Sequence, residues 1–150
     1  MTRIYGVPRW LRVANRALGR ALERGRGPAF LRLLTVVDRR TGRPRTTPIA
    51  PLFGDGGTVW LVAVYGDTAW VRNVRATGEV ELRRGDDRAD YLARELDASN
   101  SAPVLRAYLA KPTSRLVRRR FDATPGSDDA VLAAEARRHP TFELVPVGRS

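Results

Sequence analysis

Four arginines in a short turn are the residues of this sequence best suited to chemistry. They follow an apolar, β-branched run that ends at Val37, and Gly42 and Pro44 interrupt them and favour a turn. The four are Arg39, Arg40, Arg43 and Arg45. Guanidinium groups that a rigid turn holds together can bind a phosphate or a carboxylate through paired hydrogen bonds. A strand, this basic turn and a returning strand therefore form a candidate anion site, with a solvated hairpin tip as the alternative.

The composition predicts one basic domain. The chain has 150 residues, of which 43% are hydrophobic, enough for one substantial core. Its net charge of +11 arises from 27 Lys and Arg against 16 Asp and Glu, and Lys111 is the only lysine. Such a charge attracts anions of any kind and does not by itself choose among nucleic acid, anionic lipid and a small charged cofactor.

The sequence offers few residues for metal binding or nucleophilic catalysis. It has no cysteine, and His139 is its only histidine, so we expect no disulfide, no cysteine nucleophile and no metal site. His139 precedes Pro140 and is expected to end a helix. No Ser/His/Asp set can be assembled around it, and no glycine-rich nucleotide loop is present.

The N-terminal segment, about residues 8–24, predicts an amphipathic basic helix. Apolar residues recur at helical spacing, and arginines at 9, 12, 16, 20 and 24 fill the turns between them. The helix is expected either to cover the core or to contact an anionic membrane. The arginines exclude a signal peptide or a spanning helix, so a cytoplasmic location is expected, with peripheral contact at the inner face of the plasma membrane as a further hypothesis.

The remaining pattern predicts an α+β domain built on a small barrel. Strands are expected at about 30–37, 46–53, 58–64, 79–83, 89–96 and 141–147. Helices are expected at about 67–75, 99–110, 113–121 and 128–138. Pro48 and Pro51 favour an edge or bulged position for the second strand. The domain thus spans residues 1–150, with the barrel at about 30–147 and helices inserted at about 99–138.

Three motifs in order resemble a known family. They are RRTGRPRTTP at 39–48, YGD at 65–67 and AWVRNVR at 69–75. Together they look like the deazaflavin-dependent nitroreductase family, the F420H2-dependent oxidoreductases of the split β-barrel fold. The resemblance covers about residues 30–96 and implies a six-stranded antiparallel split β-barrel of the FMN-binding type.

The resemblance also implies a cofactor and a site. Coenzyme F420, a deazaflavin with a phosphate and an oligoglutamate tail, would be bound, with FMN as the alternative. The phosphate region would contact the basic turn and the adjacent strand, and the ring would lie against the next strand end and the short helix. The residues implied are Arg39, Arg40, Arg45, Thr47, Val64, Tyr65, Gly66, Trp70 and Asn73.

The implied reaction is hydride transfer from reduced F420 to a quinone, a nitroaromatic or an enone-like acceptor, with the cofactor supplying the difficult chemistry. Tyr65 is the candidate for positioning or protonating the product, the alternative being a tyrosine that only packs. The chain departs from the family pattern at Asp38, where many relatives have glycine, and in its short segment after Tyr65. Asp38 could pair with a neighbouring arginine and weaken phosphate binding.

Three other functions are weighed against this one. The first is a non-catalytic F420- or lipid-binding split-barrel protein, and the second is an FMN-dependent reductase. The third is a nucleic-acid-binding protein, which only the net charge favours, because no aromatic residues alternate with the cations of the turn. The expected partners are a small-molecule hydride acceptor and a second copy in a homodimer, without nucleic acid.

Overall fold

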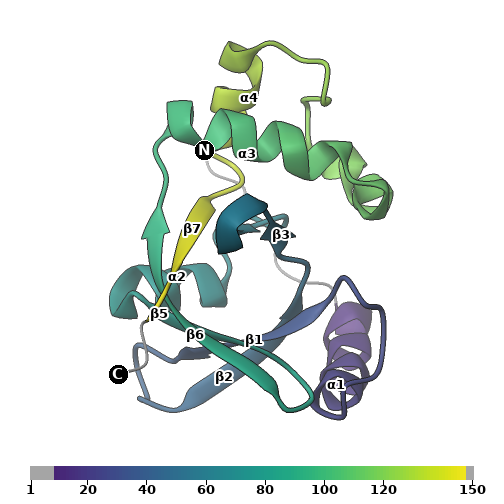
Figure 1. Ribbon diagram of the computed structural model, residues 1–150, viewed down its shortest axis with the longest axis vertical. Helices are drawn as coiled ribbons and strands as arrows, with labels where there is room; N and C mark the ends of the chain where they lie inside the picture. The colour runs from purple at the N-terminus through teal and green to yellow at the C-terminus, as the bar shows by residue number, and fades with distance from the viewer. Residues whose placement is uncertain (1–8, 148–150) are drawn as a thin grey trace.

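The computed structural model describes residues 9–147. Four α-helices and seven strands form a curled antiparallel sheet with helices around it (Figure 1). The helices are α1 (Arg9–Glu23), α2 (Ala69–Thr77), α3 (Ala98–Ala110) and α4 (Asp129–Glu135). The strands are β1 (Arg32–Val37), β2 (Pro44–Ile49), β3 (Leu52–Phe53), β4 (Val59–Val62), β5 (Glu79–Arg84), β6 (Asp87–Glu95) and β7 (Thr141–Pro146). The predicted α+β class is confirmed.

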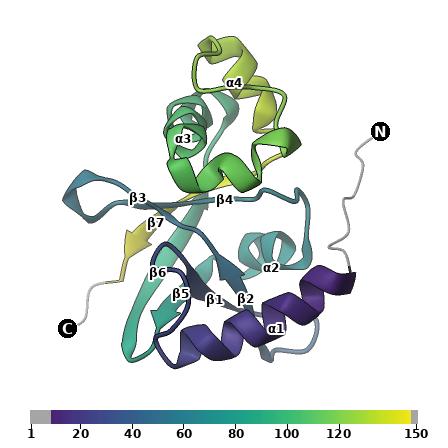
Figure 2. The ribbon, with the colours of Figure 1, turned by 90° about the vertical axis from the view of Figure 1, so that its right-hand side faces the viewer.

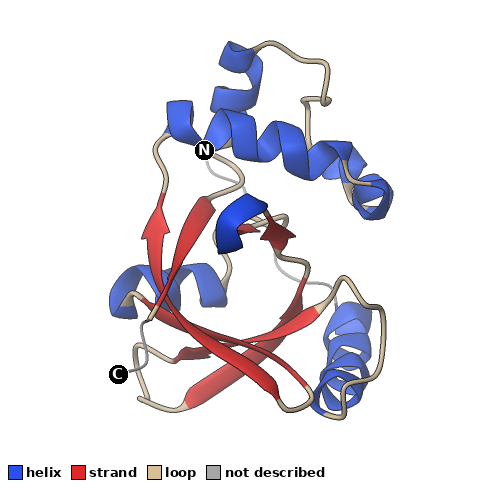
Figure 3. Cartoon of the chain, in the orientation of Figure 1, coloured by secondary structure: helices blue, strands red, loops and turns tan. Residues whose placement is uncertain are grey.

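The strands pair in the order β2-β1-β5-β6-β7-β4-β3, and every adjacent pair with a described register is antiparallel. Strands β2 and β3 follow one another in the chain yet form the two opposite edges of the sheet. The sheet therefore curls into an incomplete barrel, as the strands in Figure 3 show.

The prediction of six strands is wrong, because the segment expected as one strand at 46–53 is two. The chain leaves β2 after Ile49, and β3 begins only at Leu52, beyond Pro51. Proline lacks an N–H for the ladder and is tolerated at sheet edges. Both short strands lie at edges, which confirms the position that Pro48 and Pro51 predicted.

The helices of the second half form a separate layer over one end of the sheet (Figure 2). Helix α3 packs against α4, β4 and β7. The predicted helix at 113–121 is instead two 3-10 turns, η2 (Pro112–Leu116) and η3 (Arg118–Arg120). The Ser114 hydroxyl donates to the carbonyl of Tyr108 at 2.5 Å, and Arg118 donates to that of Leu109, so these side chains bind the end of α3 and turn the chain back.

Helix α4 is also shorter than the predicted 128–138. Asp128 accepts the N–H of Val131 as its N-cap, in agreement with the predicted start. Beyond Glu135, the N–H groups of Ala136 and Arg138 bond three residues back, the pattern of a tightened end.

Two hydrophobic cores meet at β4. Leu61 and Ala63 face the barrel interior, which also contains Leu34, Val71 and Phe142. Val62 and its neighbours on the other face pack against the helical layer, which includes Leu105, Leu109 and Leu132. Side chains alternate along a strand, so one strand serves both cores.

Helix α1 packs on β1, β2 and β5 at the other end of the molecule (Figure 2). Its apolar side contributes Leu22, which is fully buried, while Val13 and Arg16 are exposed. The predicted first residue, Pro8, and the side chains of residues 9–12 lie outside the described part. Among residues 9–147, no helix combines the length and apolar character needed to cross a membrane.

Candidate functional site

Asp38 organises the basic turn from within. One carboxylate oxygen, Oδ1, accepts the backbone N–H groups of Arg40 at 2.8 Å and Thr41 at 3.0 Å, and Oδ2 accepts Nε of Arg45 at 2.9 Å. The backbone N–H donors, followed by the Arg45 guanidinium, hold the pKa of Asp38 below its usual range. The pairing of Asp38 with an arginine is therefore present, and the same carboxylate also shapes the turn.

Asn73 of α2 fixes the turn to the rest of the molecule. Its Oδ1 accepts the backbone N–H of Arg39 at 3.1 Å and a guanidinium N–H of the same residue at 2.9 Å. Asn73 is 2% exposed, so its side of this part-buried contact is shielded from water. Arg39 thus contributes to the docking of the turn on α2.

Two arginines at the tip are available to an anion. Arg40 and Arg43 are exposed, and no ion pair of either with another residue of the described range is present. Arg43 and Arg45 also line an open hollow together with Thr41 and Pro44. Arg45 bonds Asp38 through Nε, which leaves its two terminal nitrogens for another partner.

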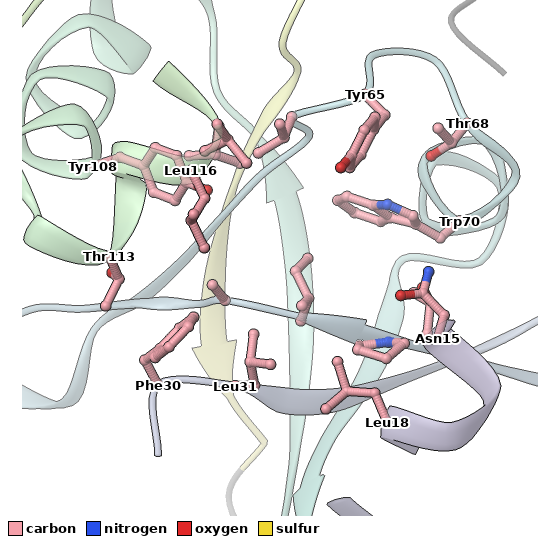
Figure 4. Close-up of a pocket in the computed structure, with 17 residues that line it drawn as sticks. Asn15, Leu18, Phe30, Leu31, Tyr65, Thr68, Trp70, Tyr108, Thr113 and Leu116 are labelled. Carbon is pink, nitrogen blue, oxygen red and sulfur yellow. The ribbon is translucent and has the colours of Figure 1, made fainter. Parts of the chain in front are cut away.

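A largely apolar cavity of about 230 Å³ lies between the barrel and the helical layer (Figure 4). Leu116, one of its lining residues, is 80% exposed. Residues from α1, β2, β4, α2, α3 and η2 and from the segments that join them contribute to its walls. The lining residues are Asn15, Leu18, Phe30, Leu31, Thr47, Pro48, Ile49, Ala50, Val62, Val64, Tyr65, Thr68, Trp70, Tyr108, Thr113, Leu116 and Val117.

One wall is the tight turn between β4 and α2. Gly66 adopts φ +78°, and a Cβ there would meet the carbonyl oxygen of Arg138 at 3.2 Å, so glycine suits this position. Thr68 precedes α2, but its hydroxyl makes no capping bond, and its buried Oγ1 has no partner among the described residues. The first intrahelical bond is donated by Arg72, which leaves the N–H groups at the start of α2 without helical acceptors.

Two tyrosines face the cavity from opposite sides. Figure 4 shows Tyr65 beside Trp70 and Tyr108 across from them, with both hydroxyl oxygens directed toward the middle. The guanidinium of Arg120 lies 4.3 Å from the ring centre of Tyr65. Burial, with a smaller contribution from Tyr65, raises the pKa of Tyr108 to about 12.

The turn and the cavity are joined by two elements. Arg45, Thr47 and Ile49 alternate along β2 and so share one face, and the distance from the first to the last is about 13 Å at strand spacing. On α2, Trp70 lines the cavity and Asn73 holds the turn, about 4.5 Å apart along the helix axis. The site thus offers an apolar surface and, next to it, cationic groups. These would suit a cofactor that has a ring and a phosphate.

The structure brings most of the predicted site residues together. Thr47, Val64, Tyr65 and Trp70 line the cavity, Gly66 forms its adjacent turn, and Arg40 and Arg45 lie in the basic turn. Asn73 does not line the cavity, and Arg39 bonds Asn73. Contact of these residues with a cofactor stays a prediction.

Sequence reasoning missed the wall contributed by α1, α3 and η2. Tyr108, Thr113 and Leu116 reach the cavity only because the helical layer folds back over β4. No motif in the sequence predicts that these three residues reach the cavity. The sequence shows Thr68 just before the main part of a predicted helix. That its hydroxyl is buried and unpaired is apparent only in the tertiary structure.

Solved structures with a similar fold support this architecture. A structure of an F420-H2-dependent reductase (FDR-A) has a TM-score of 0.55 and 22% identity, over 78% of this chain and 95% of that one. A structure described as a domain-swapped dimer has a TM-score of 0.56 and 21% identity, over 91% and 97%. A Listeria innocua protein proposed to be a pyridoxamine 5′-phosphate oxidase has a TM-score of 0.52 and 18% identity, over 89% and 93%. A homodimer and a membrane contact of this chain stay predictions.

The sequence itself gives the assignment. A comparison with curated proteins finds no match. The model of the F420H(2)-dependent quinone reductase family matches residues 9–119, which include the basic turn, α2, the cavity turn and η2. The chain therefore belongs to the F420H(2)-dependent quinone reductase family and is an oxidoreductase whose cofactor is coenzyme F420.

Proposed function

We propose that this protein reduces a quinone-type small molecule and that the cofactor lies along β2 and α2 with its phosphate at the basic turn. The observation that carries the proposal is that Thr47, which lines the apolar cavity, and Arg45, which lines the basic hollow, lie two residues apart on β2. Reduced F420, when bound, supplies a hydride. The chain then has to bind, orient and shield the reacting groups.

The basic turn suits the anionic end of the cofactor. Arg40 and Arg45 would contact the phosphate, and Arg43 lies close enough in the same turn to assist. The carboxylate of Asp38 offsets part of the attraction that Arg45 exerts on an anion. Its bonds to two backbone N–H groups, however, hold the conformation of the turn. Preorganised donors lose less conformational entropy on binding, which offsets part of the weakened attraction.

The turn after β4 suits the ring. The hydroxyl of Thr68 and the N–H groups at the start of α2 are donors that a heterocyclic ring with carbonyl groups can use. Trp70 and Val64 supply apolar surface beside them. The unpaired buried hydroxyl is the local evidence that these residues fit such a group, because buried polar atoms are normally hydrogen-bonded.

The acceptor would enter past Leu116 and lie against the helical wall. Apolar side chains there exclude water from the reacting groups, and hydroxyl groups are the polar partners that remain. Tyr65 would donate a proton to the reduced product or position it, because its hydroxyl points into the cavity. A planar, electron-poor quinone matches this lining better than a charged substrate does.

Titration with F420 tests the proposal. Wild-type protein should bind F420 with micromolar affinity, on the order of −8 kcal/mol, and FMN more weakly. Arg40→Ala and Arg45→Ala should each raise the Kd severalfold because each removes a charge-assisted contact. Arg88→Ala, which removes an exposed arginine from β6, is the matched control and should leave the Kd unchanged.

Consumption of F420H2 with menadione, followed by absorbance, completes the test. Turnover with this quinone and its loss on omission of either partner are expected. Wild-type protein that binds no F420, or that binds it without reducing any quinone, would overturn the proposal. Unchanged affinity in both arginine variants would show that the basic turn is only a solvated hairpin tip.

A further inference from the structure

Tyr108 is a buried residue whose hydroxyl faces the cavity. It lies near the end of α3 and is 5% exposed. Its ring packs against Phe121 with the ring centres 6.1 Å apart, and its carbonyl accepts the Ser114 hydroxyl and the N–H of Lys111. The backbone of Tyr108 is therefore held by hydrogen bonds and its ring by Phe121, and the hydroxyl points into the cavity (Figure 4).

No hydrogen bond joins the hydroxyl of Tyr108 to another described residue, and this hydroxyl faces the cavity (Figure 4). The walls nearest to it are largely apolar, and Tyr65 lies across the cavity. A hydroxyl directed into a ligand cavity can make its hydrogen bond with the ligand. Because its pKa is raised to about 12, this phenol keeps its proton at neutral pH and is a donor.

We propose that the Tyr108 hydroxyl donates a hydrogen bond to a carbonyl oxygen of the acceptor and holds that oxygen across the cavity from Tyr65. The inference rests on the proposed function and specifies the acceptor class as carbonyl-bearing compounds, quinones and enones. Hydride addition to such a compound places negative charge on this oxygen. A fixed donor is more effective toward that developing charge than toward the neutral carbonyl.

The two tyrosines have different environments and therefore different expected roles. Tyr65 lies in the turn next to Gly66 and carries the Arg120 guanidinium on its ring, near the cofactor side. Tyr108 lies on the opposite wall, with Thr113 and Leu116, where the acceptor would enter. Tyr108 is thus assigned to orient the substrate, and no proton transfer from it is required.

The test compares Tyr108→Phe with Tyr91→Phe. The first change removes only the hydroxyl and keeps the ring against Phe121. Tyr91, on β6, packs at the barrel core and does not line the cavity, so its variant controls for loss of a phenol elsewhere. Menadione binding to the cofactor-free protein is measured by calorimetry, F420 binding by fluorescence, and kcat and KM by absorbance with F420H2.

Tyr108→Phe should raise the menadione Kd severalfold and lower kcat/KM by roughly 10- to 100-fold, with an unchanged Kd for F420. Tyr91→Phe should match the wild type in all three measurements. An unchanged menadione Kd and kcat/KM in Tyr108→Phe, or equal losses in the two variants, would overturn the inference. A wild type that binds no F420 would overturn the proposed function, while the calorimetric comparison would still decide the role of Tyr108.

Discussion

Glu135 makes the most connected buried ionic contact of the helical layer, and its replacement should strongly destabilise the protein. The side chain is 2% exposed at the end of α4. Its Oε1 accepts the backbone N–H groups of Asp122 at 2.6 Å and Ala123 at 2.8 Å, and both carboxylate oxygens accept Arg138 at 3.0 Å. One carboxylate therefore ties the loop after η3 to the end of α4.

The same cluster reaches the cavity turn through His139. Its ring lies stacked on Phe121 with the ring centres 4.0 Å apart. Its Nδ1 is 3.1 Å from the carbonyl oxygen of Ala63, its Nε2 is 3.0 Å from that of Arg120, and Glu135 is 3.5 Å away. Loss of the Glu135 carboxylate should thus loosen the attachment of the helical layer to the end of β4.

The contacts of Glu135 determine how much each replacement should lower the free energy of unfolding. Glu135→Ala leaves the N–H groups of Asp122 and Ala123 without their acceptor, which costs about 1 to 3 kcal/mol for each. The lost pair with the half-exposed Arg138 adds less than about 1 kcal/mol. Glu135→Gln keeps an oxygen for the two N–H groups but replaces the Oε2 acceptor of Arg138 with an NH2 group. Arg138 is 41% exposed and also pairs with Asp122. The cost of Glu135→Gln should be about 1 kcal/mol.

Urea unfolding followed by tryptophan fluorescence measures both variants. Asp129→Ala is the control on the same helix, because its ion pair with Arg106 is 86% exposed at the carboxylate and should contribute less than about 1 kcal/mol. A cost below about 1 kcal/mol for Glu135→Ala would refute the reasoning. Equal costs for the alanine and glutamine variants would show that the charge, and not the backbone acceptor, is what matters.

Two further predictions concern ionisable groups. Burial lowers the pKa of His139 below its ordinary 6.5. Between the folded-state pKa and 6.5 the unfolded chain binds more protons, so the free energy of unfolding should rise with pH in that window. Urea unfolding across the window should show a smaller rise for His139→Gln, and an equal rise in the two proteins would contradict this. Asp38→Asn keeps an oxygen for the N–H groups of Arg40 and Thr41 but releases Arg45, so this variant should bind F420 as tightly as the wild type or more tightly. Asp38→Ala loses the acceptor of the two N–H groups and should bind F420 more weakly. Fluorescence titration measures both, and weaker binding to Asp38→Asn alone would refute the role of Asp38 in shaping the turn.

The sequence predicted the elements whose signals are local. Helix α3 begins one residue before the expected 99–110, and the closing strand β7 lies within the expected 141–147. Asp97 and Asp128 each cap a helix through their carboxylates, as short-range capping chemistry favours. Periodicity and capping act over a few residues, so they can be read from the chain without its partners.

Predictions failed where distant contacts decided the local conformation. The segment after Pro112 has helical spacing, but Ser114 and Arg118 bond the end of α3 and produce 3-10 turns. The second strand was predicted as continuous, but curling of the sheet places its two parts at opposite edges. In both cases tertiary contacts outweighed a weak local preference.

The sequence by itself determined the basic turn, the short helix with Trp70 and the family to which the chain belongs, because these depend on residue types at fixed spacing. The tertiary structure alone decided the roles within the site. It paired Arg39 with Asn73 over 34 positions and brought Tyr108 opposite Tyr65. Burial and hydrogen-bond partners depend on which distant surfaces meet, and only the packed chain determines that.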